Sequence, residues 1–525
     1  MATLANISQE LPTPKQDEIK VRNFIGGQWY EPSSNNFFDN FNPSTGKVLC
    51  QIPDSGAADV DLAVKAAKDA FPAWSSLTPH QRAAHIYKLA DLVEKNLSTM
   101  ATFESLDQGK TLTMATNIDI SRTAINFRFF ADLVIGDLTS VSVTGAYPKA
   151  YPGPDGKPAF GQALSYVNRT PVGVAGLISP WNLPLYLLTW KIAPCIATGN
   201  TCVCKPSEFT SVTAMMLTKL IKQAGIPDGV VNMVFGLGAT AGNALVTHPD
   251  VPLVSFTGGT ATGKAIASAT APMFKHTSLE LGGKNPALIF ADSNLDECIP
   301  SIARSSFLNQ GEICLCNSRI YVQKPIFDEF VSRFKEFVIT KVTPGDPFSP
   351  ASYYGPLVSK PHFEKVQSYV QLAREEGCNV EFCVDRALNT NVLDVSENGA
   401  LALEGLEGGY FMSPTVITNV SQKSRLVQEE IFGPVVCILP FETEEEGIQL
   451  ANDIQYGLAA TVWSVDQSRL RRVASQIQAG NLWCNCWMVR HLEMPFGGFK
   501  ASGLGTEGGR YSIDFFTKKQ AIYLG

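Results

Sequence analysis

From Val172 onward, short runs of apolar and β-branched residues alternate with longer segments in which apolar residues recur every three or four positions. Side chains return to one face every second residue in a strand and about every 3.6 residues in a helix, so these patterns predict buried strands and amphipathic helices. The expected strands are Val172–Ile178, Thr201–Cys204, Val230–Phe235, Leu253–Thr257, Ala287–Phe290 and Arg319–Val322. The expected helices are Val60–Ala70, Pro79–Asn96, Leu185–Thr198, Ser211–Ala224, Ala239–Thr247, Ala261–Thr270, Leu295–Asn309 and Ile326–Val338. Strands that alternate with helices predict βαβ units, and therefore an α/β fold around a parallel sheet.

Two β-like segments do not fit this alternation. Tyr147–Gln162 contains four prolines and three glycines, which predicts an extended arm or loop, and Ala163–Asn168 after it alternates like an antiparallel strand. The tail Phe515–Leu524 is also β-like and is too short to be a domain. Isolated β segments in an α/β protein indicate a flap that pairs with another subunit.

Length and composition narrow the class of protein. A chain of 525 residues predicts roughly two to four domains. The hydrophobic share of 45% and the charged share of 17% are ordinary for a globular protein. A formal charge of −7 provides no basic surface for nucleic acid or for an anionic membrane, so we expect neither as a partner. Ligand choice is therefore expected to come from a pocket.

No secretion signal or membrane span is expected. Residues 1–19 are polar, lack an apolar core and a small-residue cleavage site, and are expected to be disordered. No apolar run reaches the ~18 residues that a membrane span needs. The twelve cysteines are scattered along the chain, which favours reduced thiols and a cytoplasmic location.

Three cysteine pairs have a C-x-C spacing: Cys202 with Cys204, Cys314 with Cys316, and Cys484 with Cys486. Zinc sites use a C-x₂-C spacing and often matching histidine pairs, which this chain lacks, so no metal is expected. Residues two apart on a strand point to one face, so we expect two of the three pairs to be buried structural thiols.

Seven short motifs follow one another along the chain. They are Pro180-Trp181-Asn182, Lys205-Pro206-Ser207-Glu208, Phe256-Thr257-Gly258-Gly259, Glu280-Leu281-Gly282-Gly283-Lys284, Gly311-Glu312-Ile313-Cys314, Glu430-Ile431-Phe432-Gly433-Pro434 and Pro495-Phe496-Gly497-Gly498. Each is weak alone, but in this order and spacing they make the chain resemble the aldehyde dehydrogenase superfamily over residues 20–525. The family pattern has Gly-Gln-x-Cys where this chain has Gly-Glu-x-Cys, a departure at Glu312 that leaves the cysteine in place.

The resemblance implies oxidation of an aldehyde to a carboxylic acid, with Cys314 as the nucleophile. A thiolate attacks the carbonyl carbon, and the resulting thiohemiacetal expels hydride to a nicotinamide. The thioester left behind needs a deprotonated water, and Glu280 is the family's base for that step. The Asn182 amide and the Cys314 backbone N–H are the family's donors to the oxyanion. The alternatives are that Cys314 is an inert core thiol and that Glu280 only caps the Gly282-Gly283 turn. Cys316 is expected to be a structural neighbour.

Glycine turns indicate a dinucleotide site. No G-x-G-x-x-G fingerprint occurs, and Gly236-x-Gly238-x-x-x-Gly242 has a weaker spacing. Phe256–Gly263 is the better candidate, because a strand there gives way to a glycine turn and a helix N-terminus whose free N–H groups can face a pyrophosphate. The resemblance implies NAD as the cofactor, bound by Ile178, Ser179, Trp181, Lys205, Glu208, Gly238, Gly242, Phe256, Gly258, Gly259, Leu281, Glu430 and Phe432.

Within that set, Lys205 and Glu208 match the family's ribose-binding pair. A carboxylate at Glu208 can accept from the 2′-hydroxyl and would repel a 2′-phosphate, which favours NAD over NADP. Glu430 and Phe432 match the residues that hold the nicotinamide ribose and ring. The alternative for Glu208 is a solvated charge in a loop.

Two arginines indicate the kind of substrate. Arg122, on an expected helix over Asp119–Phe130, and Arg490 match positions at the entrance of the family's substrate tunnel, and Phe496 is also expected to contact substrate. Two guanidiniums suit bidentate capture of a carboxylate, so an aldehyde that carries a carboxylate is expected. The alternatives are unrelated surface arginines with retinal or an aliphatic or cationic aldehyde as substrate, and a non-catalytic NAD-binding member of the family. Arg128 is expected to be structural.

The resemblance also implies the domain organisation. Residues 20–149 and 170–282 are expected to form an NAD-binding domain of variant Rossmann type, and residues 283–497 an α/β catalytic domain. Residues 150–169 and 498–525 are expected to form an oligomerisation arm and a C-terminal tail that hold a homodimer or homotetramer together.

Overall fold

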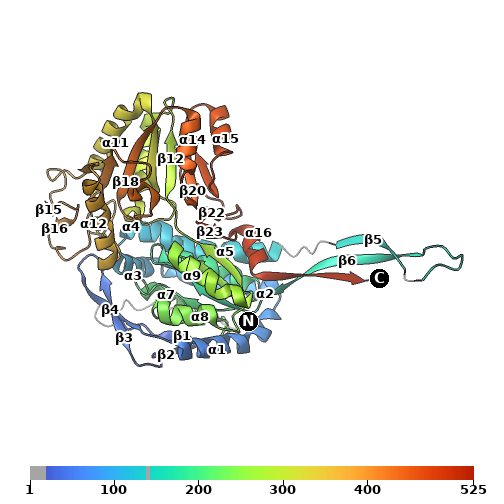
Figure 1. The fold of residues 1–525 in the computed structure, drawn as a ribbon. Coiled ribbons are helices and arrows are strands. Elements are labelled where there is room, and N and C mark those ends of the chain that lie inside the picture. Colours follow the sequence, from blue (N-terminus) through green and yellow to red (C-terminus); the bar gives the residue numbers. More distant parts are fainter. Residues whose placement is uncertain (1–18, 137–141, 150, 525) are drawn as a thin grey trace.

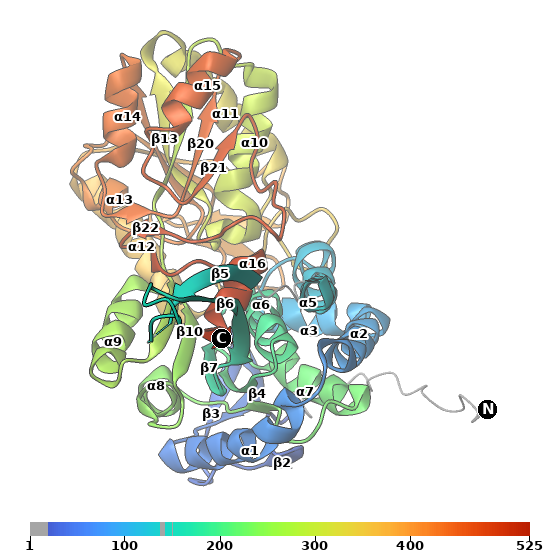
Figure 2. The same cartoon turned by 90° about the vertical axis from the view of Figure 1, so that its right-hand side faces the viewer.

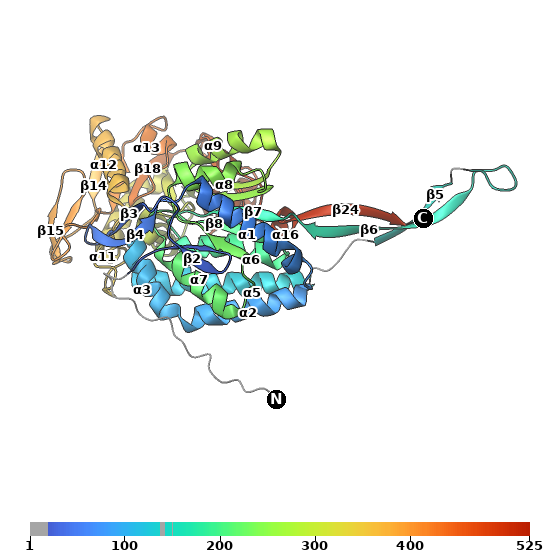
Figure 3. The same ribbon diagram turned by 90° about the horizontal axis from the view of Figure 1, so that it is seen from below.

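The computed structural model describes residues 19–136, 142–149 and 151–524. They form two α/β lobes, one above the other in Figure 2, and a narrow sheet that projects to one side in Figures 1 and 3. The prediction of disorder for residues 1–19 falls mostly on residues 1–18, which lie outside the described residues, and Ile19 is buried. The expected α/β fold with parallel sheets is confirmed.

The first lobe is built on an eight-stranded sheet in the order β2-β1-β9-β8-β7-β10-β11-β23. Its strands are β1 (Asn23–Ile25), β2 (Gln28–Tyr30), β7 (Val174–Ile178), β8 (Thr201–Lys205), β9 (Val231–Met233), β10 (Leu253–Thr257), β11 (His276–Glu280) and β23 (Gly503–Leu504). The strands from β9 to β11 are parallel. The chain runs outward from β7 first on one side and then on the other, so the strand order reverses between β7 and β10. Open parallel sheets bind ligands at the carboxyl ends of the strands at such a point.

Helices cover both faces of this sheet. They are α1 (Ala57–Ser75), α2 (Pro79–Lys95), α3 (Leu97–Gln108), α5 (Ser121–Gly136), α6 (Pro184–Ala197), α7 (Val212–Ala224), α8 (Asn243–Thr247) and α9 (Thr260–Thr270). Because strand residues alternate between faces, Val174 and Ile178 pack with α1, α8 and α9, whereas Leu177 packs with α6 and α7. Cys202 and Cys204 share the α6 and α7 face, as their spacing predicts. Helices α2, α3 and α5 form a further layer outside α6 and α7.

The second lobe is built on a seven-stranded sheet in the order β14-β17-β18-β13-β12-β20-β21. Its strands are β12 (Asn285–Ile289), β13 (Asn317–Gln323), β14 (Asn379–Phe382), β17 (Thr415–Thr418), β18 (Val435–Phe441), β20 (Ala459–Trp463) and β21 (Asn481–Cys484). Neighbouring strands are parallel except at β14, which is antiparallel to β17. One face packs with α10 (Leu295–Phe307) and α11 (Phe327–Lys341), and the other with α12 (Lys360–Glu375), α14 (Glu444–Asn452) and α15 (Gln467–Ala474).

The projecting sheet, which we call the arm, consists of β5 (Ser142–Pro148), β6 (Phe160–Pro171) and β24 (Thr517–Leu524), with β6 antiparallel to both others. Two expected boundaries differ from this arrangement. The boundary placed at residue 150 cuts through the arm, because β5 pairs with β6. Most of the expected tail before residue 517 belongs to the first lobe, because β23 extends its sheet and α16 (Gly509–Phe515) carries Ile513 and Phe515 into its core.

Most of the expected strands and helices are present, with ends shifted by a few residues. The helix expected over Ala239–Thr247 begins with a π-helical turn at Gly238–Gly242, and another π-helical turn at Ala115–Ile120 precedes α5. Such wide turns occur frequently at functional sites. The sequence patterns did not predict β1, β2 or the hairpin of β3 (Phe37–Asn42) and β4 (Lys47–Pro53).

Buried acids from the outer helical layer hold the N-terminus of α6. The Leu185 N–H donates to Glu104 Oε1 (3.1 Å), and the Tyr186 N–H donates to Asp119 Oδ1 (3.0 Å). The first N–H groups of a helix have no partner inside the helix and carry partial positive charge, so carboxylates stabilise them. These two contacts fix the position and direction of the first turn of α6.

Lys110 completes this arrangement. It forms a fully buried ion pair with Asp119, and its Nζ also donates to the backbone carbonyl of Asn182 (3.0 Å). Buried charges are stable only when they are paired and hydrogen-bonded. We call Glu104, Lys110 and Asp119 the α6 anchor, because together they hold the chain from Asn182 into the helix.

The variant Lys110→Met tests the α6 anchor. It leaves the Asp119 carboxylate buried without its ion-pair partner, which is expected to destabilise the fold by about 3–5 kcal/mol. Urea unfolding followed by circular dichroism measures the loss as a lower midpoint. The control is Lys65→Met, which breaks the exposed pair with Asp69 and is expected to leave the midpoint unchanged. Equal midpoints for the two variants would contradict the anchor.

Candidate active site

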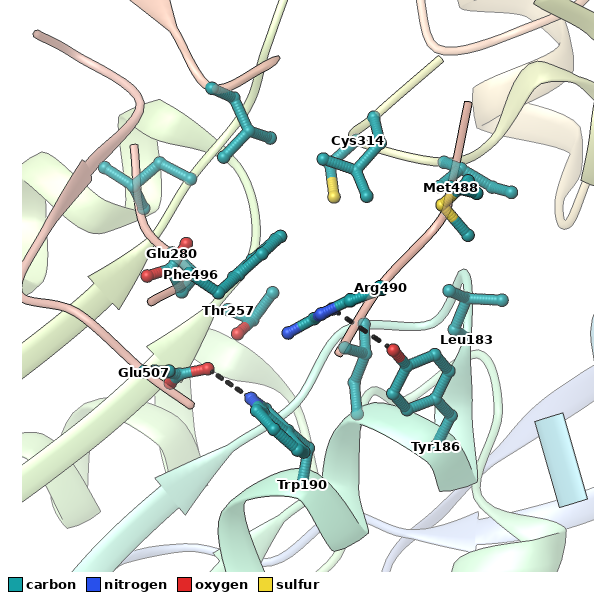
Figure 4. A pocket seen from close by; sticks show the side chains of 15 residues that line it. Leu183, Tyr186, Trp190, Thr257, Glu280, Cys314, Met488, Arg490, Phe496 and Glu507 are labelled. Atoms are coloured by element: carbon teal, nitrogen blue, oxygen red, sulfur yellow. Dashed lines mark hydrogen bonds between the residues drawn. The ribbon is translucent and has the colours of Figure 1, made fainter. Parts of the chain in front are cut away.

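A small cavity lies where the two lobes meet, and Figure 4 shows it from close by. Its lining consists of Leu183, Tyr186, Leu187, Trp190, Thr257, Glu280, Leu281, Ile313, Cys314, Leu315, Leu458, Met488, Arg490, Phe496 and Glu507. Residues from the start of α6, the ends of β10 and β11, the turn before β13 and the loops after β21 therefore meet here. The cavity brings together four residues that the sequence singled out: Cys314, Glu280, Arg490 and Phe496.

Cys314 lies in the turn before β13 and is half-buried. Its backbone carbonyl accepts from Asn285 Nδ2 (2.7 Å), which ties the turn to the start of β12. Burial, and after it the carboxyl groups of Glu430 and Glu280, raise the pKa of the Cys314 thiol to about 12. The Arg490 guanidinium acts in the opposite direction on this pKa. Without a ligand the thiol is therefore protonated at neutral pH, and nearby charges decide its reactivity.

Glu280 is the last residue of β11 and is buried. Burial raises its pKa well above the ordinary value, the neighbouring Glu507 raises it further, and Lys191 and Arg490 oppose the shift. Neither carboxyl oxygen has a hydrogen-bond partner among the described residues. Glu280 thus makes no hydrogen bond to the Gly282-Gly283 turn, and its raised pKa suits a general base.

Glu430 binds that turn instead, because its Oε1 accepts from the Gly283 N–H (2.8 Å). A Cβ on Gly282 would lie 2.3 Å from Glu430 Oε2, and a Cβ on Gly283 would lie 2.9 Å from the Cys314 carbonyl oxygen. A Cβ on Gly283 would collide with backbone, whereas a Cβ on Gly282 would displace the Glu430 carboxyl group from its present position. Glycine at these two positions is therefore what lets Glu430 and the nucleophile's turn approach the end of β11.

Asn182 lies two residues before α6 and is buried. Its backbone carbonyl accepts from Lys110 Nζ and from Asn309 Nδ2, both at 3.0 Å. Its side-chain Nδ2 donates to the backbone carbonyl of Glu312 (2.9 Å), two residues before Cys314. A primary amide has two N–H groups, so the second can donate to another acceptor in this region.

Glu312, the departure from the family pattern, fastens the nucleophile's turn to its surroundings. Its buried carboxyl group accepts from Gln108 Nε2 (2.8 Å), Gln310 Nε2 (3.1 Å) and the Val358 N–H (3.2 Å). Burial raises the pKa of Glu312 well above its ordinary value, while these hydrogen bonds oppose the shift. The three hydrogen-bond donors therefore stabilise the buried carboxyl group of Glu312 at a position where the family has glutamine.

A cleft of about 700 Å³ lies at the carboxyl ends of β7, β8 and β10, where the strand order reverses. Among its lining residues are Ile178, Ser179, Trp181, Lys205, Glu208, Gly238, Gly242, Phe256, Gly258 and Gly259. The structure thus brings these predicted cofactor residues together in one cleft. Its volume is in the range that small-molecule sites occupy.

The residues of the cleft fit a dinucleotide. A Cβ on Gly238 or on Gly259 would meet nothing within 4 Å, so a ligand can approach the backbone closely at both glycines. Gly259 directly precedes α9, whose first N–H groups attract anions such as phosphate. At the end of β8, Lys205 Nζ pairs with Glu208 Oε2 (2.8 Å), and Glu208 lines the cleft.

The other predicted cofactor residues lie beside the cleft. Leu281 lines the small cavity, and Glu430 holds the Gly282-Gly283 turn next to it. Phe432 meets Trp181 edge to face, with ring centroids 5.3 Å apart, and Trp181 belongs to the cleft. These three residues therefore lie between the lining of the cleft and that of the cavity.

The two predicted substrate arginines both contact Tyr186. Arg490 lines the cavity, where its Nη1 donates to Tyr186 Oη (3.2 Å) and its guanidinium lies 5.1 Å from the Trp190 ring and 4.0 Å from the Phe496 ring (Figure 4). Arg122 does not belong to the lining. Its guanidinium lies over the Tyr186 ring, 5.2 Å from the ring centroid, so Arg122 contacts the cavity wall from behind.

Sequence reasoning missed two parts of this cavity. The first part is the face at the start of α6, where four apolar or aromatic residues follow Asn182 at helical spacing: Leu183, Tyr186, Leu187 and Trp190. This spacing could have been recognised in the sequence. Glu507 is the second part: it accepts from Trp190 Nε1 (2.9 Å) and pairs with Lys191 Nζ (3.0 Å). No motif or periodicity in the sequence marks Glu507.

The cysteine pairs do not form a metal site in the described part of the chain, where no group of three or more His, Cys, Asp and Glu side chains could hold an ion. The Sγ atoms of Cys202 and Cys204 lie 3.7 Å apart in the core of the first lobe. Cys484 and Cys486 are half-buried.

Comparison with known proteins identifies the family. Residues 29–522 match the aldehyde dehydrogenase family. The chain is 52% identical over 507 residues to the 2-aminomuconic semialdehyde dehydrogenase of Danio rerio, which covers 96% of this chain and 98% of that one. It is 42% identical over 506 residues to the 2-hydroxymuconic semialdehyde dehydrogenase of Pseudomonas sp. (strain CF600), with 96% and 99% covered. The structure is similar to an aldehyde dehydrogenase from Bacillus cereus solved in complex with NAD⁺, with a TM-score of 0.87, 37% identity and 97% of each chain covered.

The chain therefore belongs to the aldehyde dehydrogenase family, and the resemblance read from the seven motifs is confirmed. The fold expected from that resemblance is confirmed as well.

The raised pKa of Cys314 predicts how its alkylation depends on pH. With a pKa of about 12, the thiolate fraction rises about tenfold for each pH unit between pH 7 and pH 9, and the rate should rise in proportion. Iodoacetamide labelling followed by peptide-resolved mass spectrometry measures this rate. In denaturant the alkylation rate of the same thiol should level off above about pH 9, because the pKa of an unfolded cysteine is roughly 8.5. A plateau near neutral pH in the native protein would contradict the prediction.

Proposed function

We propose that this protein oxidises 2-aminomuconate 6-semialdehyde to 2-aminomuconate, with NAD as the hydride acceptor and a thioester on Cys314. The observation that carries the proposal is the single cavity in which Cys314, Glu280 and Arg490 meet. A thiol, a carboxyl group of raised pKa and a guanidinium match the three tasks of the reaction. These tasks are attack on the aldehyde, activation of water and binding of an anionic group.

In the first half of the reaction the Cys314 thiol loses its proton to water, the thiolate attacks the aldehyde carbon, and the carbonyl oxygen becomes an oxyanion. The free N–H of the Asn182 side chain and the Cys314 backbone N–H donate to this oxyanion. The α6 anchor matters here because it holds the Asn182 backbone through Lys110. NAD, when bound, accepts the hydride that leaves the former aldehyde carbon.

In the second half a water molecule attacks the thioester on Cys314. Glu280 takes the proton from this water, and the raised pKa that burial gives its carboxyl group makes it a stronger base than an exposed carboxylate. Hydrolysis releases the carboxylic acid and restores the thiol. The absence of hydrogen-bond partners for Glu280 among the described residues leaves both of its oxygens available for this water.

The cleft at the ends of β7, β8 and β10 is the proposed NAD site. Lys205 and Glu208 would hold the adenosine ribose, and the Glu208 carboxylate would repel the 2′-phosphate of NADP. The turn at Gly258–Gly259 and the N-terminus of α9 would receive the pyrophosphate. Glu430 and Phe432 would hold the nicotinamide end on the side of Cys314.

The charge around the cavity supports an anionic substrate. Arg490 has no carboxylate partner among the described residues, and the Nη2 atom of Arg122 is buried there without a hydrogen-bond partner. Buried guanidinium groups are stable when an anion pairs with them. 2-Aminomuconate 6-semialdehyde, an intermediate of tryptophan catabolism through kynurenine, has an aldehyde at one end and a carboxylate at the other.

A second candidate substrate is 2-hydroxymuconic semialdehyde. It has the same two end groups, and one of the relatives is named for it. Retinal and aliphatic aldehydes lack the carboxylate and would leave Arg490 unpaired. A non-catalytic role would not require Cys314 and Glu280 to share a cavity.

The proposed assembly is a cytoplasmic homodimer or homotetramer formed through the arm. Val143, Phe160 and Tyr523 on the arm are 58%, 64% and 73% exposed in the single chain. Exposed apolar side chains on a projecting sheet favour pairing with another subunit. Within residues 19–136, 142–149 and 151–524, no helix has the length and apolar character to cross a bilayer.

The proposed reaction is tested with Cys314→Ala and Glu280→Gln. Cys314→Ala is expected to abolish NADH formation, because no nucleophile remains. Glu280→Gln is expected to release one NADH per active site in a burst and then turn over about 10²- to 10⁴-fold more slowly than the wild type, because hydrolysis lacks its base. Stopped-flow absorbance of NADH resolves both phases. Substantial turnover by Cys314→Ala, or a wild-type steady-state rate for Glu280→Gln, would refute the assigned roles.

The anionic substrate is tested with two six-carbon aldehydes, 6-oxohexanoate and hexanal, which differ in a terminal carboxylate. Arg490→Ala and Arg122→Ala are expected to lower kcat/KM for 6-oxohexanoate by a factor that corresponds to about 2–5 kcal/mol, the strength of a buried charge pair. The value of kcat/KM for hexanal should fall much less, because there Arg490 acts only through its effect on the pKa of Cys314 and Glu280. The control is Arg128→Ala, since Arg128 pairs with Asp91 and Glu94 on the surface and should affect neither aldehyde. Equal losses for both aldehydes would make the two arginines structural.

A further inference from the structure

Tyr186 occupies an unusually constrained position in the first turn of α6. Its side chain lines the cavity and is 6% exposed. Its backbone N–H donates to Asp119 Oδ1 (3.0 Å), and its backbone carbonyl accepts from Asn126 Nδ2 (3.0 Å). Buried polar groups therefore hold the backbone of this residue at both its N–H and its carbonyl.

The ring of Tyr186 stands between the two arginines of the proposed substrate site. The Arg122 guanidinium faces the ring at 5.2 Å from its centroid, while Arg490 Nη1 donates to the phenol oxygen (3.2 Å), as Figure 4 shows for Arg490. The phenol oxygen thus acts as an acceptor. Its own O–H has no acceptor among the described residues, so one donor remains available on the cavity side.

Unpaired positive charge surrounds this donor. Burial is the main cause that lowers the pKa of Arg122; Tyr186 opposes the shift, and the nearby Arg490 adds to it. No carboxylate within the described residues forms an ion pair with either guanidinium, although Glu280 and Glu507 line the same cavity, and Arg490 lies against the Trp190 and Phe496 rings. Two groups that can donate a hydrogen bond to an anion, the Tyr186 O–H and the Arg490 guanidinium, therefore lie together on the cavity wall, and Arg122 lies behind the Tyr186 ring.

We propose that Tyr186 determines specificity for aldehydes with a terminal carboxylate. Its phenol O–H donates to the carboxylate that Arg490 binds, and its ring packs against Arg122 and keeps that arginine next to the carboxylate site. This proposal rests on the proposed function, because it names a further residue for the same substrate. In the complex Arg490 and the Tyr186 O–H would donate to the two carboxylate oxygens. A phenol supplies this hydrogen bond without adding another positive charge.

The phenol also explains how the site would reject neutral aldehydes. Without a carboxylate, the buried O–H of Tyr186 and the half-buried guanidinium of Arg490 would lie beside an apolar chain that offers them no acceptor. Sites built to hydrogen-bond a polar group discriminate strongly against analogues that lack it, because the buried partners are then left unpaired.

The test compares Tyr186→Phe with the wild type on 6-oxohexanoate and hexanal. Phenylalanine keeps the ring next to Arg122 and removes the O–H. We expect kcat/KM for 6-oxohexanoate to fall by about 10- to 100-fold, mainly through KM, and kcat/KM for hexanal to change by less than about twofold. The matched control is Tyr87→Phe, whose phenol binds Asp132 on the outer surface between α2 and α5, and which should change neither value.

A second measurement uses adipate, the product of 6-oxohexanoate oxidation, as an inhibitor of hexanal turnover. Its inhibition constant is expected to rise in Tyr186→Phe by the same factor as KM for 6-oxohexanoate. If the wild type shows no preference for 6-oxohexanoate over hexanal, the proposed substrate class is overturned. If the wild type shows the preference and Tyr186→Phe keeps it, or if both aldehydes lose equally, only the role of Tyr186 is overturned.

Discussion

The ion pair of Lys110 and Asp119 is buried completely at the first turn of α6. A buried charge without its partner is strongly destabilising, so the segment that carries Lys110 and Asp119 is stable against α6 when the two side chains meet. That arrangement fixes Asn182 through its carbonyl and Tyr186 through its N–H. The oxyanion donor and the wall of the substrate cavity in the proposed mechanism thus depend on one buried electrostatic contact, although neither residue carries a charge.

A second constraint acts where the lobes meet. β11 of the first lobe ends at Glu280, and the turn at Gly282-Gly283 leads directly into the second lobe. The Cys314 carbonyl approaches Gly283 so closely that a Cβ would collide with it, and a Cβ on Gly282 would displace the Glu430 carboxyl group. The proposed base and nucleophile come from different lobes, and the two glycines keep them at one cavity. The position of the chemistry is therefore determined by backbone contact as much as by side chains.

These constraints explain which features the sequence could predict. Strands buried on both faces are continuously apolar, so β7, β8, β10, β12 and β13 were visible as local patterns. Four of the seven motifs lie at the ends of β7, β8, β10 and β11, and the resemblance that the motifs carry assigned their residues to the cavity and the cleft. Local patterns do not record how distant segments pack. The place of Arg122 beside the Tyr186 ring depends on the packing of α5 against α6, and β5 is a strand only because it pairs with β6.

The charges of the cavity are also coupled through Arg490. Its guanidinium opposes the burial that raises the pKa of Cys314 and of Glu280, so in the free protein it favours the ionised form of both groups. A substrate carboxylate bound to Arg490 would cancel much of that effect. The thiol would then hold its proton more tightly unless attack on the aldehyde follows at once, while the Glu280 carboxylate would become a stronger base for the water of the second half-reaction. An anionic tail at Arg490 would thus oppose the first step slightly and assist the second, and product release would reset both groups.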